Sequence, residues 1–228
     1  MFFHWSYLLL IPGMLLTFWA SSNIKGTYRR YSQIQSSLGM TGAQVAQKIL
    51  QQMNIRDVRV ERVAGELTDH YDPGAKVVRL SDGIYNSSSL AAAAVAAHEC
   101  GHVLQDKQGY SFMNLRASLV PAANIGGQIS PLLIMAGLFL GQLGQIFIFI
   151  GIALFLGVIA FHLVTLPVEL DASSRALKLI NQLGILQGDE NKGARAVLNA
   201  AAWTYVATAL YALLQLAQYL ILLTSRNR

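Results

Sequence analysis

The 228-residue chain is 54% hydrophobic and only 13% charged, which is too apolar for an ordinary soluble domain and predicts a membrane protein. Its net charge of +5 does not indicate nucleic-acid binding, because no cluster of Lys and Arg is interleaved with aromatic residues. The single cysteine, Cys100, excludes an intramolecular disulfide, so a reducing cytoplasm suits the polar part of the chain.

The first apolar stretch covers residues 2–20 and is followed closely by Lys25, Arg29 and Arg30. A stretch of this length with a positive flank predicts a membrane span. It lacks both the basic start and the small-residue cleavage site of a signal peptide, which indicates a retained segment. We therefore assign residues 1–20 to an N-terminal transmembrane anchor.

Residues 21–116 form a polar domain that holds 11 of the 17 Lys/Arg and 8 of the 12 Asp/Glu. A capping-box pattern predicts a helix over residues 41–53, and alternating or β-rich runs predict strands at 58–63 and 76–81. The second run, KVVRLS, is interpreted either as an exposed edge strand that binds an extended substrate or as a fully paired strand. The alanine-rich run at 90–106 follows three serines and predicts a further helix.

The remainder of the chain is mostly apolar. Residues 131–166 contain no charged side chain, and 36 residues are enough for two spans that begin a little before Pro131 and turn near Gly141. We assign the rest of the chain to a transmembrane hairpin at 117–166, a polar segment at 167–202, and a C-terminal transmembrane helix and tail at 203–228.

The distribution of positive charge predicts the orientation of the spans. With four crossings, 15 of the 17 Lys/Arg lie on the cytoplasmic side, as the positive-inside rule requires. Only Arg226 and Arg228 then lie on the opposite side, which leaves the topology of the last apolar segment open. We expect the polar domain at the cytoplasmic face.

His98, Glu99 and His102 form an HExxH sequence, HECGH, inside the predicted alanine-rich helix. Histidines four residues apart project from the same helical face and can share one metal ion, and imidazole nitrogens suit Zn²⁺. Glu99 lies beside the first histidine and can take a proton from a metal-activated water. The pattern therefore predicts a zinc hydrolase with Glu99 as the general base.

A catalytic zinc usually has three protein ligands, so a third ligand must come from elsewhere in the chain. The metzincin extension would need His at position 108, and Gln108 excludes that class. Pro167 predicts a helix break, after which Glu169 and Asp171 start a new helical segment. Either carboxylate is a candidate ligand, because a two-span hairpin returns both to the membrane face that carries His98.

Two long stretches carry a family resemblance, LTDHYDPGAKVVRLSDGIYNSSSLAAAAVAAHECGHVLQD and, after the hairpin, LPVELDASSRA. Over nearly its full length the chain closely resembles the bacterial YugP-like family of membrane zinc peptidases. That family is distantly similar to the HtpX and CAAX-prenyl endopeptidases, in which a glutamate opening an E-x-x-x-D segment completes the zinc site. The resemblance implies Glu169 as third ligand and puts Ser173 where the relatives have Asp. Asp171 is the alternative ligand or the replacement for that carboxylate.

Three more polar residues are candidates for roles beside the metal. Asp106 follows His102 by four residues and either orients a ligand imidazole or is a solvated helix end. His70 and Tyr71 either donate a hydrogen bond to the oxyanion of the reaction or stabilise a turn.

Taken together, pattern and resemblance imply a mainly α membrane protein with about four transmembrane helices. A small α+β, zincin-like (gluzincin-type) cytoplasmic domain carries the HExxH helix. The expected activity is a Zn²⁺-dependent endopeptidase of the bacterial plasma membrane that cleaves a polypeptide, such as a membrane or unfolded protein, at the cytoplasmic face. The alternative is a membrane scaffold or adaptor whose structural zinc is closed by a fourth ligand such as Asp171 or His70. A transporter is disfavoured because the apolar spans carry almost no charge.

Overall fold

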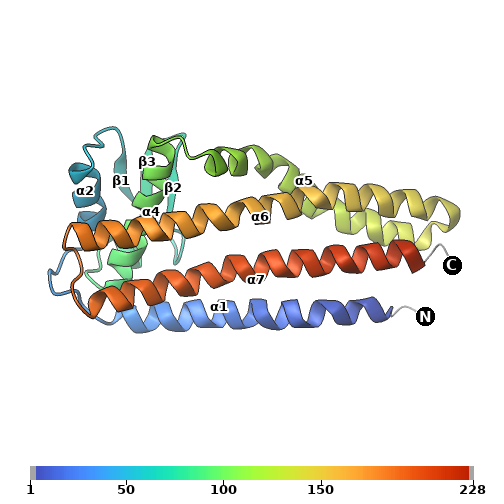
Figure 1. Ribbon diagram of the computed structural model, residues 1–228, viewed down its shortest axis with the longest axis horizontal. Helices are drawn as coiled ribbons and strands as arrows, with labels where there is room; N and C mark the ends of the chain where they lie inside the picture. Colours follow the sequence, from blue (N-terminus) through green and yellow to red (C-terminus); the bar gives the residue numbers. More distant parts are fainter. Residues whose placement is uncertain (1–3, 226–228) are drawn as a thin grey trace. The chain divides into compact units, whose positions relative to one another are not determined.

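The computed structural model describes residues 4–225, which contain seven α-helices, two short 3-10 helices and one three-stranded sheet. Figure 1 labels the main elements. In chain order they are η1 (Trp5–Leu9), α1 (Leu10–Ser32), α2 (Gly42–Gln52), β1 (Arg59–Val63), β2 (His70–Asp72), β3 (Val77–Ser81), α3 (Asp82–Tyr85), α4 (Leu90–Lys107), α5 (Ser111–Phe139), η2 (Gly141–Leu143), α6 (Gly144–Gln182) and α7 (Glu190–Ser225).

The chain divides into two compact units. One, which we call the helical unit, comprises Met1–Ser21, Ser111–Pro167 and Trp203–Arg228. The other, which we call the site unit, comprises Ser22–Tyr110 and Val168–Ala202. Four helical stretches among the described residues are long and apolar enough to cross a membrane, which agrees with the predicted number of spans: Trp5–Ser32, Ser111–Phe139, Gly141–Gln182 and Glu190–Ser225.

Within the helical unit the chain reverses between α5 and α6, as Figure 1 shows. Glycine allows the two helices to approach closely: a Cβ atom at Gly126 would lie 2.4 Å from the carbonyl oxygen of Leu154. Small residues at helix contacts are typical of membrane proteins, where backbone proximity replaces the hydrophobic effect as the source of association. The predicted turn near Gly141 is correct, but α5 begins at Ser111, well before the expected position.

The last apolar segment is part of α7 and packs against α1 in the same unit. A Cβ atom at Gly13 would lie 3.0 Å from side-chain atoms of both Tyr211 and Leu214. The indole rings of Trp19 and Trp203 meet edge to face with centroids 5.6 Å apart. Arg226 and Arg228, which made the topology of this segment doubtful, lie outside the described residues.

In the site unit the sheet has the strand order β1-β3-β2, with β3 parallel to β1 and antiparallel to β2. The KVVRLS run is therefore the fully paired central strand, and the interpretation of it as an exposed edge strand is wrong. Val77, Val78 and Leu80 are completely buried, so the apolar character of this run reflects its central position.

Helix α4 is the central helix of the site unit and starts as its sequence predicts. The Ser89 hydroxyl accepts a hydrogen bond from the Ala92 amide, which caps the first turn. The alanines that follow are buried, and α2, capped by the predicted Thr41–Gln44 box, packs against them. Short side chains along α4 thus let neighbouring elements lie close to the helix that carries HECGH.

Candidate metal centre

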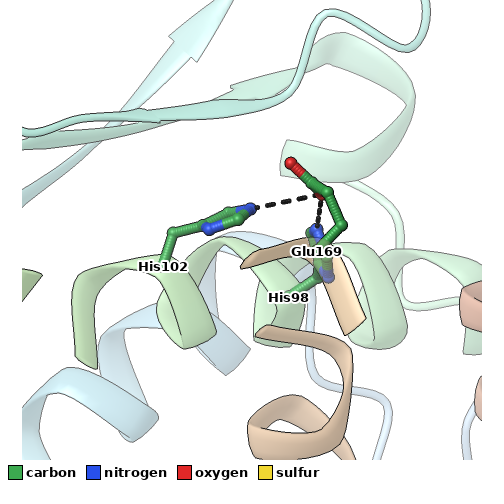
Figure 2. A group of neighbouring side chains, drawn as sticks. All are labelled: His98, His102 and Glu169. Carbon is green, nitrogen blue, oxygen red and sulfur yellow. Dashed lines mark hydrogen bonds and ion pairs between the residues drawn. The ribbon is translucent and has the colours of Figure 1, made fainter. Parts of the chain in front are cut away.

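His98, His102 and Glu169 converge on one point within the site unit. The two histidines project from the same face of α4, with ring centroids 4.8 Å apart, and the glutamate comes from α6. Their ligand atoms all lie within 4.8 Å of one another, and Figure 2 shows both imidazoles directed at the Glu169 carboxylate. The cluster thus joins two side chains of α4 to one of α6, and His98 and Glu169 are 71 positions apart in the sequence.

The spacing of these atoms fits a metal ion. Glu169 Oε2 lies 3.2 Å from His98 Nε2 and 3.6 Å from His102 Nε2. Ligand atoms at about 2.0–2.1 Å from a tetrahedral Zn²⁺ are about 3.3 Å apart, so both separations are close to what one shared ion needs. Two imidazole nitrogens and one carboxylate oxygen also match the donor set of catalytic zinc sites.

Gly101 explains how α6 comes close enough to deliver Glu169. A Cβ atom at this position would lie only 2.4 Å from the carbonyl oxygen of Ala172, a distance that backbone atoms do not tolerate. Glycine in a helix interior costs about 1 kcal/mol relative to alanine, so the close approach of α4 and α6 has to outweigh that cost.

The continuity of α6 corrects one expectation. The sequence predicts a helix break at Pro167, just before Glu169, but α6 runs without interruption from Gly144 to Gln182. Proline lacks only its own N–H, and long apolar helices accept this loss when neighbouring groups and local adjustments satisfy the freed carbonyl. Glu169 therefore lies in the interior of a helix, so the local field of a helix start does not act on it.

Gln105, which was not among the predicted site residues, fixes the orientation and the tautomer of the His102 imidazole. Its Nε2 donates to the Val168 carbonyl and to Asp171 Oδ2, each at 2.8 Å, which determines the orientation of the amide. Its Oε1 therefore faces His102 Nδ1 at 2.9 Å, and that nitrogen must carry the proton. The lone pair of His102 is consequently on Nε2, the nitrogen nearest Glu169.

The other candidates after the hairpin take supporting positions. Ser173 Oγ lies 3.2 Å from His98 Nδ1, so the residue that replaces the relatives' Asp still contacts a ligand imidazole. Asp171 is not part of the three-residue cluster; its Oδ2 bonds Gln105 and also accepts from Arg175 at 2.5 Å. Asp171 therefore supports His102 through Gln105.

Glu99 is buried beside the cluster, with 6% of its surface exposed, and within residues 4–225 its carboxylate has no hydrogen-bond partner. Burial raises the pKa of Glu99, although the neighbouring His98 and His102 oppose this effect. Burial by itself lowers the pKa of His102, but Glu169 and Glu99 more than compensate and raise it. Two carboxylates around two imidazoles make this interior site attractive to a cation.

Three predicted site residues lie elsewhere in the hydrogen-bond network. Asp106 Oδ2 accepts from Tyr71 Oη at 2.7 Å and from Lys76 Nζ at 2.6 Å, so its partners are these two groups and not a ligand imidazole. His70 contacts the Thr68 carbonyl and Arg79 on the exposed side of β2. These contacts favour the interpretation that Tyr71 and His70 stabilise the local structure, and not the interpretation that they donate hydrogen bonds to the oxyanion of the reaction.

Gln105 could have been found from its spacing alone. It follows His102 by three residues, which puts both side chains on the same face of α4. Carboxylates are the usual partners of a ligand imidazole, so the sequence pattern pointed to Asp106, one residue further on. A neutral amide serves equally well as an acceptor when its N–H groups have partners of their own.

Comparison with known proteins agrees with this site. Residues 6–224 match the model of the family described as "Putative neutral zinc metallopeptidase". The chain is 43% identical over 214 residues, 94% of each chain, to the "Putative membrane protease YugP" of Bacillus subtilis (strain 168). No solved structure matches.

Proposed function

Because the chain belongs to the family of neutral zinc metallopeptidases matched over residues 6–224, we propose that it is a zinc-dependent endopeptidase embedded in the membrane. The observation that carries this proposal is the convergence of His98, His102 and Glu169 beside a buried Glu99. Three protein ligands leave a fourth position for water or substrate, which is the arrangement of catalytic zinc sites.

In the proposed mechanism His98, His102 and Glu169 hold the ion through two Nε2 atoms and one carboxylate oxygen. A zinc ion at this position would polarise the scissile carbonyl and make a water molecule more acidic. Gln105 keeps the proton of His102 on Nδ1, and the Ser173 hydroxyl oxygen is placed to accept a hydrogen bond from Nδ1–H of His98. Both imidazoles are thereby held in the orientation in which Nε2 is free to bind.

Glu99 is the proposed general base. Its carboxylate takes one proton from the attacking water as the oxygen forms its bond to the carbonyl carbon. The same proton then passes to the nitrogen of the departing amine as the peptide bond breaks. Burial favours this role, because it raises the pKa of Glu99 above its ordinary value and so helps the carboxylate to hold the proton between the two steps.

The distribution of positive charge supports one side of the membrane for the site. Fifteen of the seventeen Lys/Arg fall in segments that the positive-inside rule assigns to the cytoplasm, and the proposed ligands lie in those same segments. We therefore infer that cleavage occurs at the cytoplasmic face of a bacterial plasma membrane. Polypeptides at that surface, including membrane proteins and unfolded chains, are the proposed substrates.

A structural zinc in a membrane scaffold is the second candidate, and it needs a fourth protein ligand. The two residues that could supply one have other partners: Asp171 bonds Gln105 and Arg175, and His70 bonds Thr68 and Arg79. Zinc analysis of single Ala variants at positions 98, 102, 169 and 171 distinguishes the two. We expect three indispensable positions, whereas a fourth would favour the scaffold.

Substitution Glu99→Gln tests the mechanism. The full-length protein, purified in detergent, should keep its zinc because this residue is not a ligand in the proposal. Cleavage of a quenched fluorescent unfolded polypeptide should fall by at least about 100-fold, the usual contribution of a general base. Undiminished cleavage by the zinc-loaded variant would refute the proposed role.

A further inference from the structure

A cavity of about 560 Å³ lies in the site unit at the end of α1. One wall is a single face of α1, where Lys25, Tyr28, Arg29 and Ser32 follow the i, i+3, i+4, i+7 spacing. None of the proposed zinc ligands lines this cavity. Its volume is within the range of cavities that hold small ligands.

Two cations line this cavity without forming an ion pair in the described part of the chain. Within residues 4–225 neither Lys25 nor Arg29 makes an ion pair, in contrast to Lys76 and Arg79, which pair with Asp106 and Asp72. Side chains four residues apart on a helix can reach the same ligand. An ammonium and a guanidinium in this arrangement are suited to bind the oxygens of one phosphate group.

The rest of the lining narrows the chemistry of the ligand. Glu66 also lines the cavity, and its carboxylate would repel a bare phosphate but can accept hydrogen bonds from hydroxyl groups. Gln33 adds an amide on the same side as the cations. A phosphate diester that carries free hydroxyls satisfies all of these groups, whereas a compact anion does not.

The position of the cavity along α1 indicates where such a ligand comes from. Lys25 follows the last residue of the first apolar stretch, Ala20, by five positions, which is about 7–8 Å along a helix. The polar headgroup layer on each side of a bilayer is about 5–8 Å thick. Lys25 is therefore expected at the depth of lipid phosphates, and the exposed side chain of Leu67 lines the cavity as an apolar contact.

We propose that this cavity binds the phosphoglycerol headgroup of an anionic phospholipid, with Lys25 and Arg29 on the phosphate and Glu66 on the glycerol hydroxyls. The site goes beyond the proposed peptidase activity and does not depend on zinc. It would fix the protein to anionic regions of the inner leaflet, where basic pockets commonly recognise headgroups.

The test measures lipid binding by the full-length protein in detergent with native mass spectrometry. The probes are phosphatidylglycerol, phosphatidic acid, phosphatidylcholine and water-soluble glycerophosphoglycerol. The double substitution Lys25→Gln/Arg29→Gln is compared with Arg30→Gln/Arg56→Gln, which removes the same charge from exposed positions that do not line the cavity. Zinc content of both variants serves as the control for folding.

We expect phosphatidylglycerol binding to weaken by about tenfold or more in the cavity variant and by less than about twofold in the control variant. Glu66→Gln should weaken phosphatidylglycerol binding and strengthen that of phosphatidic acid, which lacks the hydroxyls. If glycerophosphoglycerol binds as tightly as the lipid, the natural ligand of the cavity is a soluble phosphate ester, and the proposal that it is a lipid is wrong. Equal losses in the two double variants, or no preference over phosphatidylcholine, would overturn the site itself.

Discussion

The amide oxygen of Gln105 lies 2.9 Å from Nδ1 of His102, and the amide nitrogen of the same side chain bonds two acceptors contributed by α6. One buried glutamine therefore links the helix that carries two proposed ligands to the helix that carries the third. It fixes the tautomer of His102 and the distance between the helices at the same time.

Removing this link should weaken metal binding. In Gln105→Leu the Nδ1–H of His102 loses its acceptor, and we expect zinc affinity to fall by about 10–100-fold, as for other groups that orient metal ligands. Competition with a chromophoric chelator measures the affinity, and the visible spectrum of the Co²⁺-loaded protein reports the ligand field. Gln47→Leu, at an exposed position on α2, is the control and should bind zinc normally. An unaltered affinity in the Gln105 variant would contradict this role.

The contact between Ser173 and His98 leads to a paired prediction. Ser173→Ala removes the hydroxyl that lies 3.2 Å from Nδ1 and should reduce zinc affinity by several-fold. Ser173→Asp supplies the carboxylate that the relatives' pattern has at this position, and a charged acceptor makes the imidazole a stronger ligand. We therefore expect the order of zinc affinity to be Asp, Ser, Ala, measured by the same chelator competition. An unchanged zinc affinity in Ser173→Ala would show that the hydroxyl plays no such part.

Gly101 provides a steric test of the approach of α4 to α6. In Gly101→Ala the new Cβ meets the Ala172 carbonyl at 2.4 Å, so the helices must separate, at a cost of about 1–3 kcal/mol. Thermal unfolding should start at a lower temperature, and bound zinc should fall because Glu169 moves away from the histidines. Gly26→Ala, in α1 with open space around it, is the matched control and should be neutral or slightly stabilising. Full zinc occupancy in the Gly101 variant would mean that the close approach is unnecessary.

Asp106 gives a prediction about pH. Partial burial by itself raises the pKa of Asp106, but hydrogen bonds from Lys76 and Tyr71 outweigh it and lower the pKa below its ordinary value. The pKa of Asp106 is therefore lower in the folded than in the unfolded protein, where it is about 4. The ionised carboxylate stabilises the fold at pH values above about 4, and this contribution is lost as the pH falls through the pKa of the folded protein.

The substitution Asp106→Asn should therefore destabilise the protein by about 1 kcal/mol at pH 7, and the difference should shrink toward pH 3. Unfolding followed by tryptophan fluorescence at the two pH values measures it. Asp189→Asn, whose pairing with Lys192 is exposed on both sides, should have no measurable effect. A difference that does not change with pH would rule out the ionised carboxylate as the source.

The sequence predicts those parts of the molecule that depend on local patterns. The capping serine at 89, the alanine run and the HECGH spacing determine α4 and the orientation of its histidines, and apolar stretches of sufficient length identify four long helices. The expectation that Glu169 lies beside these histidines agrees with the cluster that the three residues form, because a charge-free stretch of 36 residues is long enough for two spans that bring the chain back.

The features that the sequence does not predict are those set by packing between distant segments. The role of Gln105 depends on the backbone of α6 at Val168, and Gly101 is required by contact with Ala172. Pro167 does not stop α6, because the propensity of a single residue is weaker than the environment of a long apolar helix. The central position of β3 likewise follows from its pairing on both sides, since its residues alone also fit an edge.

X-ray absorption at the zinc edge of the full-length protein tests the central claim most directly, because it counts the ligand atoms around the ion. We predict two imidazoles and a carboxylate oxygen at about 2.0–2.1 Å with one further light atom from water, and loss of the carboxylate contribution in Glu169→Ala. Four protein ligands around the ion, or a spectrum that is unchanged by Glu169→Ala, would contradict the hydrolytic site.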